Sequence, residues 1–151
     1  MEVSEGSCRL GLWFVRVTWS GNTIHRVRFA TTGIEGDVPT LIRQYCAGRP
    51  VDLSSLETVA IHDDTAYSQI YEIVREVPYG ETVTYGEIAA VAGTSPRVVG
   101  QAMARNPTPL IIPCHRIVAA NGIGGFSPDL EIKVALLEME KKGKRKKQVG
   151  L

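Results

Sequence analysis

The residues best suited to covalent chemistry stand together: Cys114, His115 and Arg116 directly follow the proline-rich segment 107–113. A thiol attacks carbon only as thiolate, so a neighbouring group must lower its pKa or take its proton. The adjacent imidazole of His115 suits that task, and Glu140 is a candidate for the acid that completes a Cys-His-acid relay. The alternative is that Cys114 is a small buried apolar residue, as free cysteines often are.

The segment before the cysteine predicts a rigid approach. Its apolar run, residues 110–112, is typical of a short buried strand. Its three prolines restrict φ and remove backbone donors. We therefore expect a stiff backbone that directs the thiol toward a substrate.

Two short helices lie just upstream. Residues 84–87 (Thr-Tyr-Gly-Glu) form a capping box for the first helix, which ends at Gly93. Ser95 and Pro96 predict the start of a second helix that runs to about Arg105. Two helices joined by Gly-Thr-Ser predict a helix-turn-helix, a pattern that many helical pairs share.

The second helix carries small residues where larger ones would be ordinary. Gly100 costs about 1 kcal/mol relative to Ala inside a helix, which calls for a reason. One reason is close packing of a neighbouring helix, and the other is close approach to a DNA groove. The face that would meet such a groove carries Arg97, Gly100, Gln101, Ala104 and Arg105. Val99, Ala102 and Met103 are expected to point inward, with Met103 near the cysteine.

The motif Ile-Pro-Cys-His-Arg-Ile-Val (residues 112–118) resembles the active-site signature of the O6-alkylguanine-DNA alkyltransferases, or methylated-DNA–protein-cysteine methyltransferases. The resemblance extends in order through about residues 67–140. It implies a DNA repair protein that flips an alkylated guanine out of duplex DNA. It also implies direct and irreversible transfer of the O6-alkyl group to Cys114, once per molecule and without a cofactor.

The resemblance also implies a role for individual residues. The catalytic set would be a Cys, water, His and Glu relay, with a tyrosine that assists the leaving guanine, a supporting lysine and a hinge asparagine: Cys114, His115, Glu140, Tyr85, Lys133 and Asn106. DNA would be held in the minor groove by an arginine finger and its neighbours: Arg97, Gly100, Gln101, Ala104 and Arg105. The base pocket would be lined by Met103, Ile123, Phe126 and Ser127, and by Ile117 through its backbone.

The chain departs from the family pattern at three places. Phe126 stands where many relatives have Tyr, and Pro128 follows Ser127 where some have Gly. The first departure puts a hydroxyl contact in doubt, and the second predicts a stiffer pocket wall with less tolerance for bulky alkyl groups. The N-terminal part lacks the Cys and His set of relatives that bind zinc there, so no metal is expected.

Composition excludes several classes of protein. No apolar run approaches the roughly 18 residues of a membrane span, and no signal peptide is recognisable, so a cytoplasmic, DNA-associated monomer is expected. The widely spaced cysteines Cys8, Cys46 and Cys114 do not support a zinc ribbon. A disulfide between Cys8 and Cys46 stays open, although a reducing cytoplasm disfavours it.

The net charge of +1 conceals a division. The basic tail, residues 141–147, holds six of the 17 Lys and Arg residues, which leaves 11 basic against 16 acidic residues in the body. Between residues 82 and 127 the only acid is Glu87, so the middle of the chain is locally basic, as phosphate binding requires. The tail is either a solvated, disordered run of charge or a supplementary DNA contact.

The order of the elements predicts an α+β fold. Residues 1–61 are expected to form a small antiparallel-sheet domain, RNase H-like by resemblance, and 64–151 a mainly helical DNA-binding and alkyl-acceptor domain. The linker would be about 51–63. Within the first part, residues 9–19 and 23–30 read as strands around a turn at 20–22, and Asp37 as the cap of a helix over 38–47. His25 reads as a surface or satisfied histidine, and His62-Asp63 as weak evidence for a metal.

Further predictions concern the C-terminal half. A helix through Ile70 and Val74 is expected to stop at Pro78-Tyr79-Gly80. The glycine-rich loop 119–127 would be a pocket wall or a plain surface turn. Ser127-Pro128 is expected to cap a last helix.

Two other functional classes compete with the alkyl acceptor. One is a non-catalytic DNA-binding protein that recognises alkylguanine or a specific site, although relatives of that kind lack the cysteine. The other is an ordinary thiol hydrolase that uses Cys114 and His115. The number of alkyl groups transferred per protein distinguishes the three.

Overall fold

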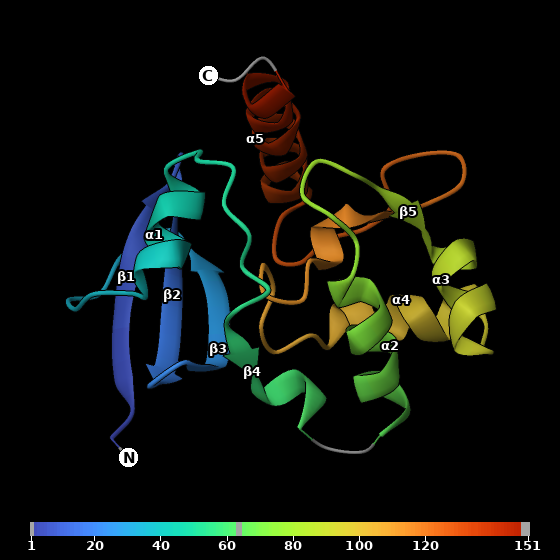
Figure 1. The fold of residues 1–151 in the computed structure, drawn as a ribbon, viewed down its shortest axis with the longest axis horizontal. Helices are drawn as coiled ribbons and strands as arrows, with labels where there is room; N and C mark the ends of the chain where they lie inside the picture. The colour runs from blue at the N-terminus through green and yellow to red at the C-terminus, as the bar shows by residue number, and fades with distance from the viewer. Residues whose placement is uncertain (1, 63–64, 149–151) are drawn as a thin grey trace.

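The computed structural model describes residues 2–62 and 65–148 and shows an α+β fold (Figure 1). A four-stranded sheet forms the N-terminal part, in the order β1-β2-β3-β4. Its strands are β1 (Ser4–Leu10), β2 (Trp13–Ser20), β3 (Thr23–Ala30) and β4 (Glu57–Thr58). The expected antiparallel sheet is wrong in one respect: β4 pairs with β3 in parallel, which makes the sheet mixed. The chain passes through helix α1 (Thr40–Cys46) before it returns, so β4 enters in the direction of β3.

The first two strands were predicted as one. Residues 9–19 contain the end of β1, a turn at Gly11, and most of β2. Gly11 has φ +57°, a left-handed conformation that glycine adopts without steric cost. The β2–β3 turn and the whole of β3 lie where the alternating pattern predicted them.

Helix α1 begins differently from the prediction. Its N-cap is Pro39, without a side-chain capping bond, and Asp37 lies outside the helix. Asp37 instead pairs with Arg43 at 3.2 Å across the exposed surface. The predicted stop is confirmed, since Gly48 follows the helix with φ +95°.

The C-terminal half is mostly helical. Its elements are the 3₁₀ turn η1 (Val59–Ile61), α2 (Ala66–Arg75), β5 (Val83–Thr84), α3 (Tyr85–Ala92), α4 (Pro96–Ala104), the 3₁₀ turn η2 (Cys114–Arg116), β6 (Ile117–Val118) and α5 (Leu130–Gln148). The caps predicted for α3 and α4 are confirmed. Thr84 and Glu87 form a reciprocal capping box, and Ser95 accepts a hydrogen bond from the amide of Val98. Gly93 ends α3 in the left-handed conformation and turns the chain into α4.

The approach to Cys114 is a tight turn and not a strand. Leu110, Ile111 and Ile112 are buried as predicted, but only an isolated bridge joins Pro109 to Ile112. Leu110 has φ +77°, which is uncommon for a residue with a branched apolar side chain. The prolines stiffen a reversal of the chain here, where an apolar run alone suggested extension.

Helix α5 differs from expectation at both ends. Its first turn is capped by Asp129, whose carboxylate accepts from the amide of Glu131 at 2.9 Å, and not by Ser127. At the other end the basic tail continues the helix, so the disordered alternative is wrong. Lys144 there packs its stem against Gly80 and pairs with Glu81. Among the described residues, no helix is both long and apolar enough to cross a membrane.

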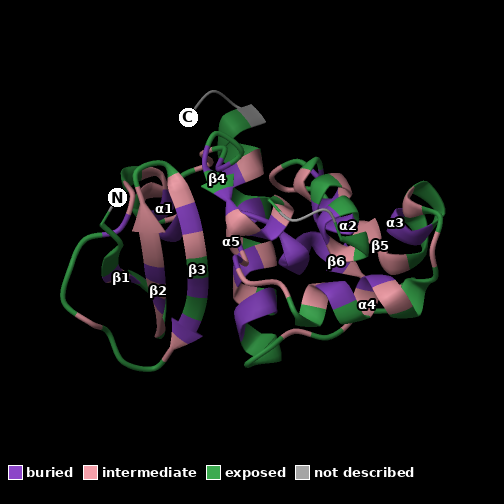
Figure 2. Cartoon of the chain, turned by 90° about the horizontal axis from the view of Figure 1, so that it is seen from below, coloured by how far each residue is buried: buried purple, intermediate pink, exposed green. Residues whose placement is uncertain are grey.

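Two apolar clusters meet beneath the cysteine. The first joins the sheet and α1 to Leu110, Ile111, Ile132 and Leu136, and the second joins α2, α3 and α4 to Ile112 and Ile117. Figure 2 shows buried residues along β3 and α5. The segment 107–118 therefore contributes to both clusters, which fixes the backbone around Cys114. The proposed domain boundary near residue 62 stays a prediction.

Candidate active site

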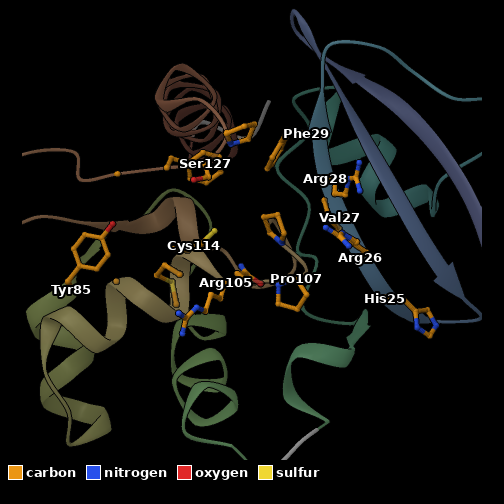
Figure 3. Close-up of a pocket in the computed structure, with 18 residues that line it drawn as sticks. His25, Arg26, Val27, Arg28, Phe29, Tyr85, Arg105, Pro107, Cys114 and Ser127 are labelled. Carbon is orange, nitrogen blue, oxygen red and sulfur yellow. The ribbon is translucent and has the colours of Figure 1, made fainter.

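Cys114 begins the turn η2 at the bottom of a groove between the two halves of the molecule (Figure 3). Its backbone amide donates to Ile112 O at 2.7 Å, and only 7 % of the residue is exposed. The thiol is therefore held in one place and is reached only through the groove.

Asn106 supports the cysteine from the end of α4. Its side-chain amide donates to Ile112 O at 2.9 Å, and its side-chain oxygen accepts from the amide of Thr108 at 3.0 Å. Burial raises the pKa of the Cys114 thiol, while hydrogen bonding from Asn106 and the charge of Lys133 lower it. Because burial dominates, Cys114 needs a base to become a thiolate at neutral pH.

The imidazole of the next residue, His115, is already bonded to a carboxylate. His115 Nε2 lies 2.7 Å from Glu140 Oε2, and both side chains are only 1 % exposed. Burial lowers the pKa of His115, and Glu140 opposes that shift. A neutral imidazole that donates from Nε2 to the carboxylate leaves Nδ1 as an acceptor. Nδ1 is buried and has no hydrogen-bond partner among the described residues.

Glu140 accepts hydrogen bonds from three parts of the chain: α1, the segment at Gly80, and the turn η2. The Arg116 guanidinium binds both carboxylate oxygens at 2.9 Å, Gly80 N donates to Oε1 at 3.0 Å, and the Tyr45 hydroxyl donates to Oε2. Burial alone would raise the pKa of Glu140, but hydrogen bonds from His115 and Arg116 and the charge of Arg116 hold it well below its ordinary value. Glu140 is therefore a fixed anion that orients His115.

Sequence reasoning missed two members of this cluster. Arg116 stands in the motif itself, and an arginine beside a buried acid is a usual partner, so it was open to prediction. Tyr45 lies in α1 of the N-terminal half and is fully buried. Its hydroxyl oxygen is 3.2 Å from His115 Nε2. Its sequence position gives no sign of this contact, because 70 residues separate the two.

Lys133 and Tyr85 lie together on the other side of the cysteine. Lys133 Nζ donates to Ile117 O at 2.6 Å and to Gly125 O at 3.1 Å, and it lies 5.8 Å from the centre of the Tyr85 ring. Burial lowers the pKa of Lys133 to about 8. Burial likewise raises the pKa of Tyr85, so its hydroxyl stays protonated. A Cβ on Gly124 would lie 2.9 Å from the Tyr85 ring, so the glycine-rich loop must carry glycine there.

The groove has a volume of about 840 Å³ and runs from Cys114 to the edge of β3. The predicted residues that line it are Tyr85, Gly100, Met103, Ala104, Arg105, Asn106, Cys114, Phe126 and Ser127. The glycine-rich loop contributes Gly125 and is a wall of the groove, as one of the two predictions had it. Neither Ile117 nor Ile123 is among the lining residues. Ile117 is fully buried, and only its backbone carbonyl, the part that the resemblance implies, reaches the site through Lys133. Ile123 is half-buried.

Helix α4 presents its polar face to solvent. Arg97 and Gln101 are exposed and lie outside the groove lining, whereas Val99 and Ala102 are fully buried, as predicted. Nothing lies within 4 Å of a Cβ built on Gly100. The packing explanation for this glycine is therefore wrong, and the surface beside it is open to a partner.

The remaining predicted features bear on metals and disulfides. His25 is a satisfied histidine, with Nε2 2.7 Å from the Ser20 hydroxyl. Asp63 of the His62-Asp63 pair lies outside the described residues. Within the part of the chain that is described, no three His, Cys, Asp or Glu side chains gather as metal ligands. Cys8, Cys46 and Cys114 are free thiols.

Comparison with known proteins agrees with this geometry. Residues 65–142 match the family described as 6-O-methylguanine DNA methyltransferase, DNA binding domain. A methylated-DNA–protein-cysteine methyltransferase of Methanopyrus kandleri is 50 % identical over 99 residues, which are 66 % of this chain and 75 % of that protein.

Solved structures extend the likeness to the N-terminal half. The crystal structure of Mycobacterium tuberculosis O6-methylguanine methyltransferase has a TM-score of 0.74 and 26 % identity, over 93 % of this chain and 94 % of the other. The crystal structure of the M. tuberculosis protein in complex with DNA has a TM-score of 0.75 and 25 % identity, over 95 % of this chain and 94 % of the other. The chain belongs to the methylated-DNA–protein-cysteine methyltransferase family, DNA repair proteins that act on O6-alkylated guanine in DNA.

Proposed function

We propose that the protein transfers the O6-alkyl group of guanine in duplex DNA to Cys114, irreversibly and once per molecule. The observation that carries the proposal is the arrangement around Cys114: a buried thiol at the groove floor, followed in the chain by a neutral histidine that a fixed carboxylate orients. A raised thiol pKa keeps the sulfur protonated and unreactive until a substrate and a base are both in place.

His115 is the proposed base. Its Nδ1 atom accepts the thiol proton through a water molecule, as the relay of the family implies, while Nε2 stays bonded to Glu140. Glu140 stabilises the imidazolium that forms and keeps its own negative charge, because Arg116 holds its pKa low. Tyr45 fixes the carboxylate from the N-terminal half and is a positioning residue.

The thiolate then attacks the alkyl carbon, and the bond between that carbon and O6 breaks. Guanine leaves with the electron pair on O6. A hydrogen bond from the Tyr85 hydroxyl stabilises this oxyanion until the guanine takes up a proton. The Lys133 ammonium group lies 5.8 Å from the centre of the Tyr85 ring and helps to position it. The product is a thioether with no good leaving group, so the sulfur keeps the alkyl group.

DNA contact is proposed for helix α4. An O6 atom in a stacked pair cannot reach a buried thiol, so the base must be flipped out, at a cost of a few kcal/mol. Arg97 is the proposed finger that fills the vacated stack, and the open surface at Gly100 suits a tight minor-groove approach. The pairing of α3 and α4 supports a helix-turn-helix, and the M. tuberculosis relative was crystallised in complex with DNA. Met103, Phe126 and Ser127 would contact the flipped base, with Gln101, Ala104 and Arg105 along the DNA face.

The mass of the protein after incubation with excess methylated DNA tests the proposal. The expected result is a gain of one methyl group per molecule on Cys114, and no gain for Cys114→Ala, which still binds DNA. Continuous product release without a mass change would instead identify a thiol hydrolase. DNA binding without any transfer would identify a non-catalytic binding protein.

A further inference from the structure

The wall of the groove opposite α4 is strand β3 of the N-terminal sheet. His25, Arg26, Val27, Arg28 and Phe29 all line it, across from Arg105 (Figure 3). Strand β4 pairs only with the start of β3, at Thr23 and Ile24. Beyond that point the edge of β3 faces the groove, and Val27 N donates to Pro107 O at 3.0 Å. The groove is therefore built from both halves of the molecule.

The groove is strongly basic. Three arginines, Arg26, Arg28 and Arg105, contribute to the lining, and no Asp or Glu does. Arg26 and Arg28 are exposed, and neither forms an ion pair with a carboxylate in residues 2–62 and 65–148. Arg105, in contrast, is held by the Tyr67 hydroxyl at 2.8 Å. The β3 guanidiniums are left for a ligand outside the described chain.

The position of Arg28 in the sheet is electrostatically unfavourable. Arg28 lies directly opposite Arg16 in the antiparallel pair, and like charges in that position destabilise a sheet. Arg16 turns away and donates to Thr32 O at 2.9 and 3.1 Å. Arg28 keeps its place on the groove wall without such a partner among the described residues. Positive charge kept at a cost indicates an anionic ligand.

We propose that β3 is a second DNA-binding element, in which Arg26 and Arg28 bind phosphates of the duplex whose base enters the groove. The proposal rests on the proposed alkyl transfer. Residues two apart on a strand are about 6.6 Å apart, so the two guanidiniums form a row along the wall. A row of cations continuous with the floor at Cys114 fits a polyanion that passes over the groove. Guanidinium also suits phosphate, because it donates two parallel hydrogen bonds.

The double variant Arg26→Gln/Arg28→Gln tests this surface. Affinity for a duplex with one O6-methylguanine is measured across a salt series, with the Cys114→Ala background to prevent transfer. Each lost phosphate contact makes the slope of log K against log salt less steep by about 0.9 and weakens binding about eightfold at 0.1 M salt. We therefore expect a slope change of about 1.8. The matched control is Arg9→Gln/Arg49→Gln, which removes the same charge from exposed sites outside the groove lining.

Thermal unfolding of each variant confirms that it is folded. An unchanged slope and affinity in Arg26→Gln/Arg28→Gln would overturn the inference, and so would an equal loss in the control pair, since that would reflect net charge alone. Methylation of the wild-type Cys114 by the same duplex is followed in parallel by mass. If the wild type is methylated but Arg26→Gln/Arg28→Gln binds DNA unchanged, only the inference about β3 fails. If the wild type is not methylated, the proposed function fails.

Discussion

The two sides of Cys114 differ in how their polar groups are used. On one side Tyr45, His115, Arg116 and Glu140 are buried and bonded to one another. On the other side Arg97 and Gln101 of α4, like Arg26 and Arg28 of β3, are exposed. The first group is bonded within the protein, and the second is exposed to solvent and proposed to bind DNA. Substitutions should therefore change stability and intrinsic chemistry on the buried side, and DNA affinity on the exposed side.

The largest effect on the rate of alkyl transfer is expected for substitution of His115, the proposed general base. His115→Gln should lower the rate of alkyl transfer by about 10²–10⁴, the usual contribution of general base catalysis. Its pH profile should also change. The wild-type rate should be level near neutrality and fall in acid as His115, whose pKa burial lowers, takes up a proton. The variant rate should rise with pH, because the pKa of Cys114 is raised and little thiolate is present at neutrality. Rates with free O6-benzylguanine across pH measure both profiles, and identical shapes would exclude His115 as the base.

Glu140→Gln should have the largest effect on stability. Removing one partner of a buried ion pair leaves Arg116 uncompensated and costs about 3–5 kcal/mol. The folded-state pKa of Glu140 lies below its ordinary value of about 4.3, so its contribution is present above that pH and is lost as the pH falls. Denaturant unfolding from pH 7 downward should show this loss in the wild type and a flatter curve in the variant. A wild-type stability that rises in acid would contradict the assignment of a buried anion.

On the exposed side, Arg97→Ala is expected to lower the rate on duplex DNA about 10–100-fold. The reason is that an unfilled stack makes base flipping more costly, by a few kcal/mol at most. Transfer from free O6-benzylguanine needs no flipping and should change far less. The ratio of the two rates isolates the finger role, and equal losses on both substrates would disprove it.

Tyr45→Phe removes one hydroxyl and keeps the ring. We expect a loss of about 1.5–3 kcal/mol in unfolding free energy, since the bond is made to a charged group. Transfer from free O6-benzylguanine should slow as Glu140 loses one of its restraints. Tyr67→Phe, which removes the hydroxyl that Arg105 contacts at the surface, is the matched control. If the two variants lose the same stability, Tyr45 does not act through the buried cluster.

Gly100→Ala should give the smallest change in stability, and it should raise stability where the other variants lower it. Because the new Cβ meets nothing within 4 Å, Ala should stabilise α4 by about 0.5–1 kcal/mol. On a surface used by DNA, the same methyl group should weaken duplex binding. A higher melting temperature together with a lower DNA affinity would show, in a single variant, that this surface serves DNA binding and not stability. Unchanged affinity would mean that DNA does not approach this point closely.

Local sequence was sufficient for several parts of the structure. The capping box at Thr84 and Glu87, the N-cap at Ser95 and the stop at Gly93 are set by bonds within a few residues, so the two helices were predictable. The same holds for β3, whose alternation reflects its own two faces. The short motif around Cys114 was also enough to place a thiol beside an imidazole and to indicate the family.

Other features depend on residues far apart in the chain, and the tertiary structure decided them. The run 110–112 is apolar in a strand or in a buried turn alike, and only its contact with two cores selects the turn with Leu110 at φ +77°. Tyr45 reaches Glu140 across 95 residues of sequence, and β3 forms a wall of a groove whose floor is Cys114. Sequence determined which residues can do the chemistry, because reactivity belongs to residue types. Folding determined which distant side chains hold their charges in place and which stay exposed, because burial and contact exist only in three dimensions.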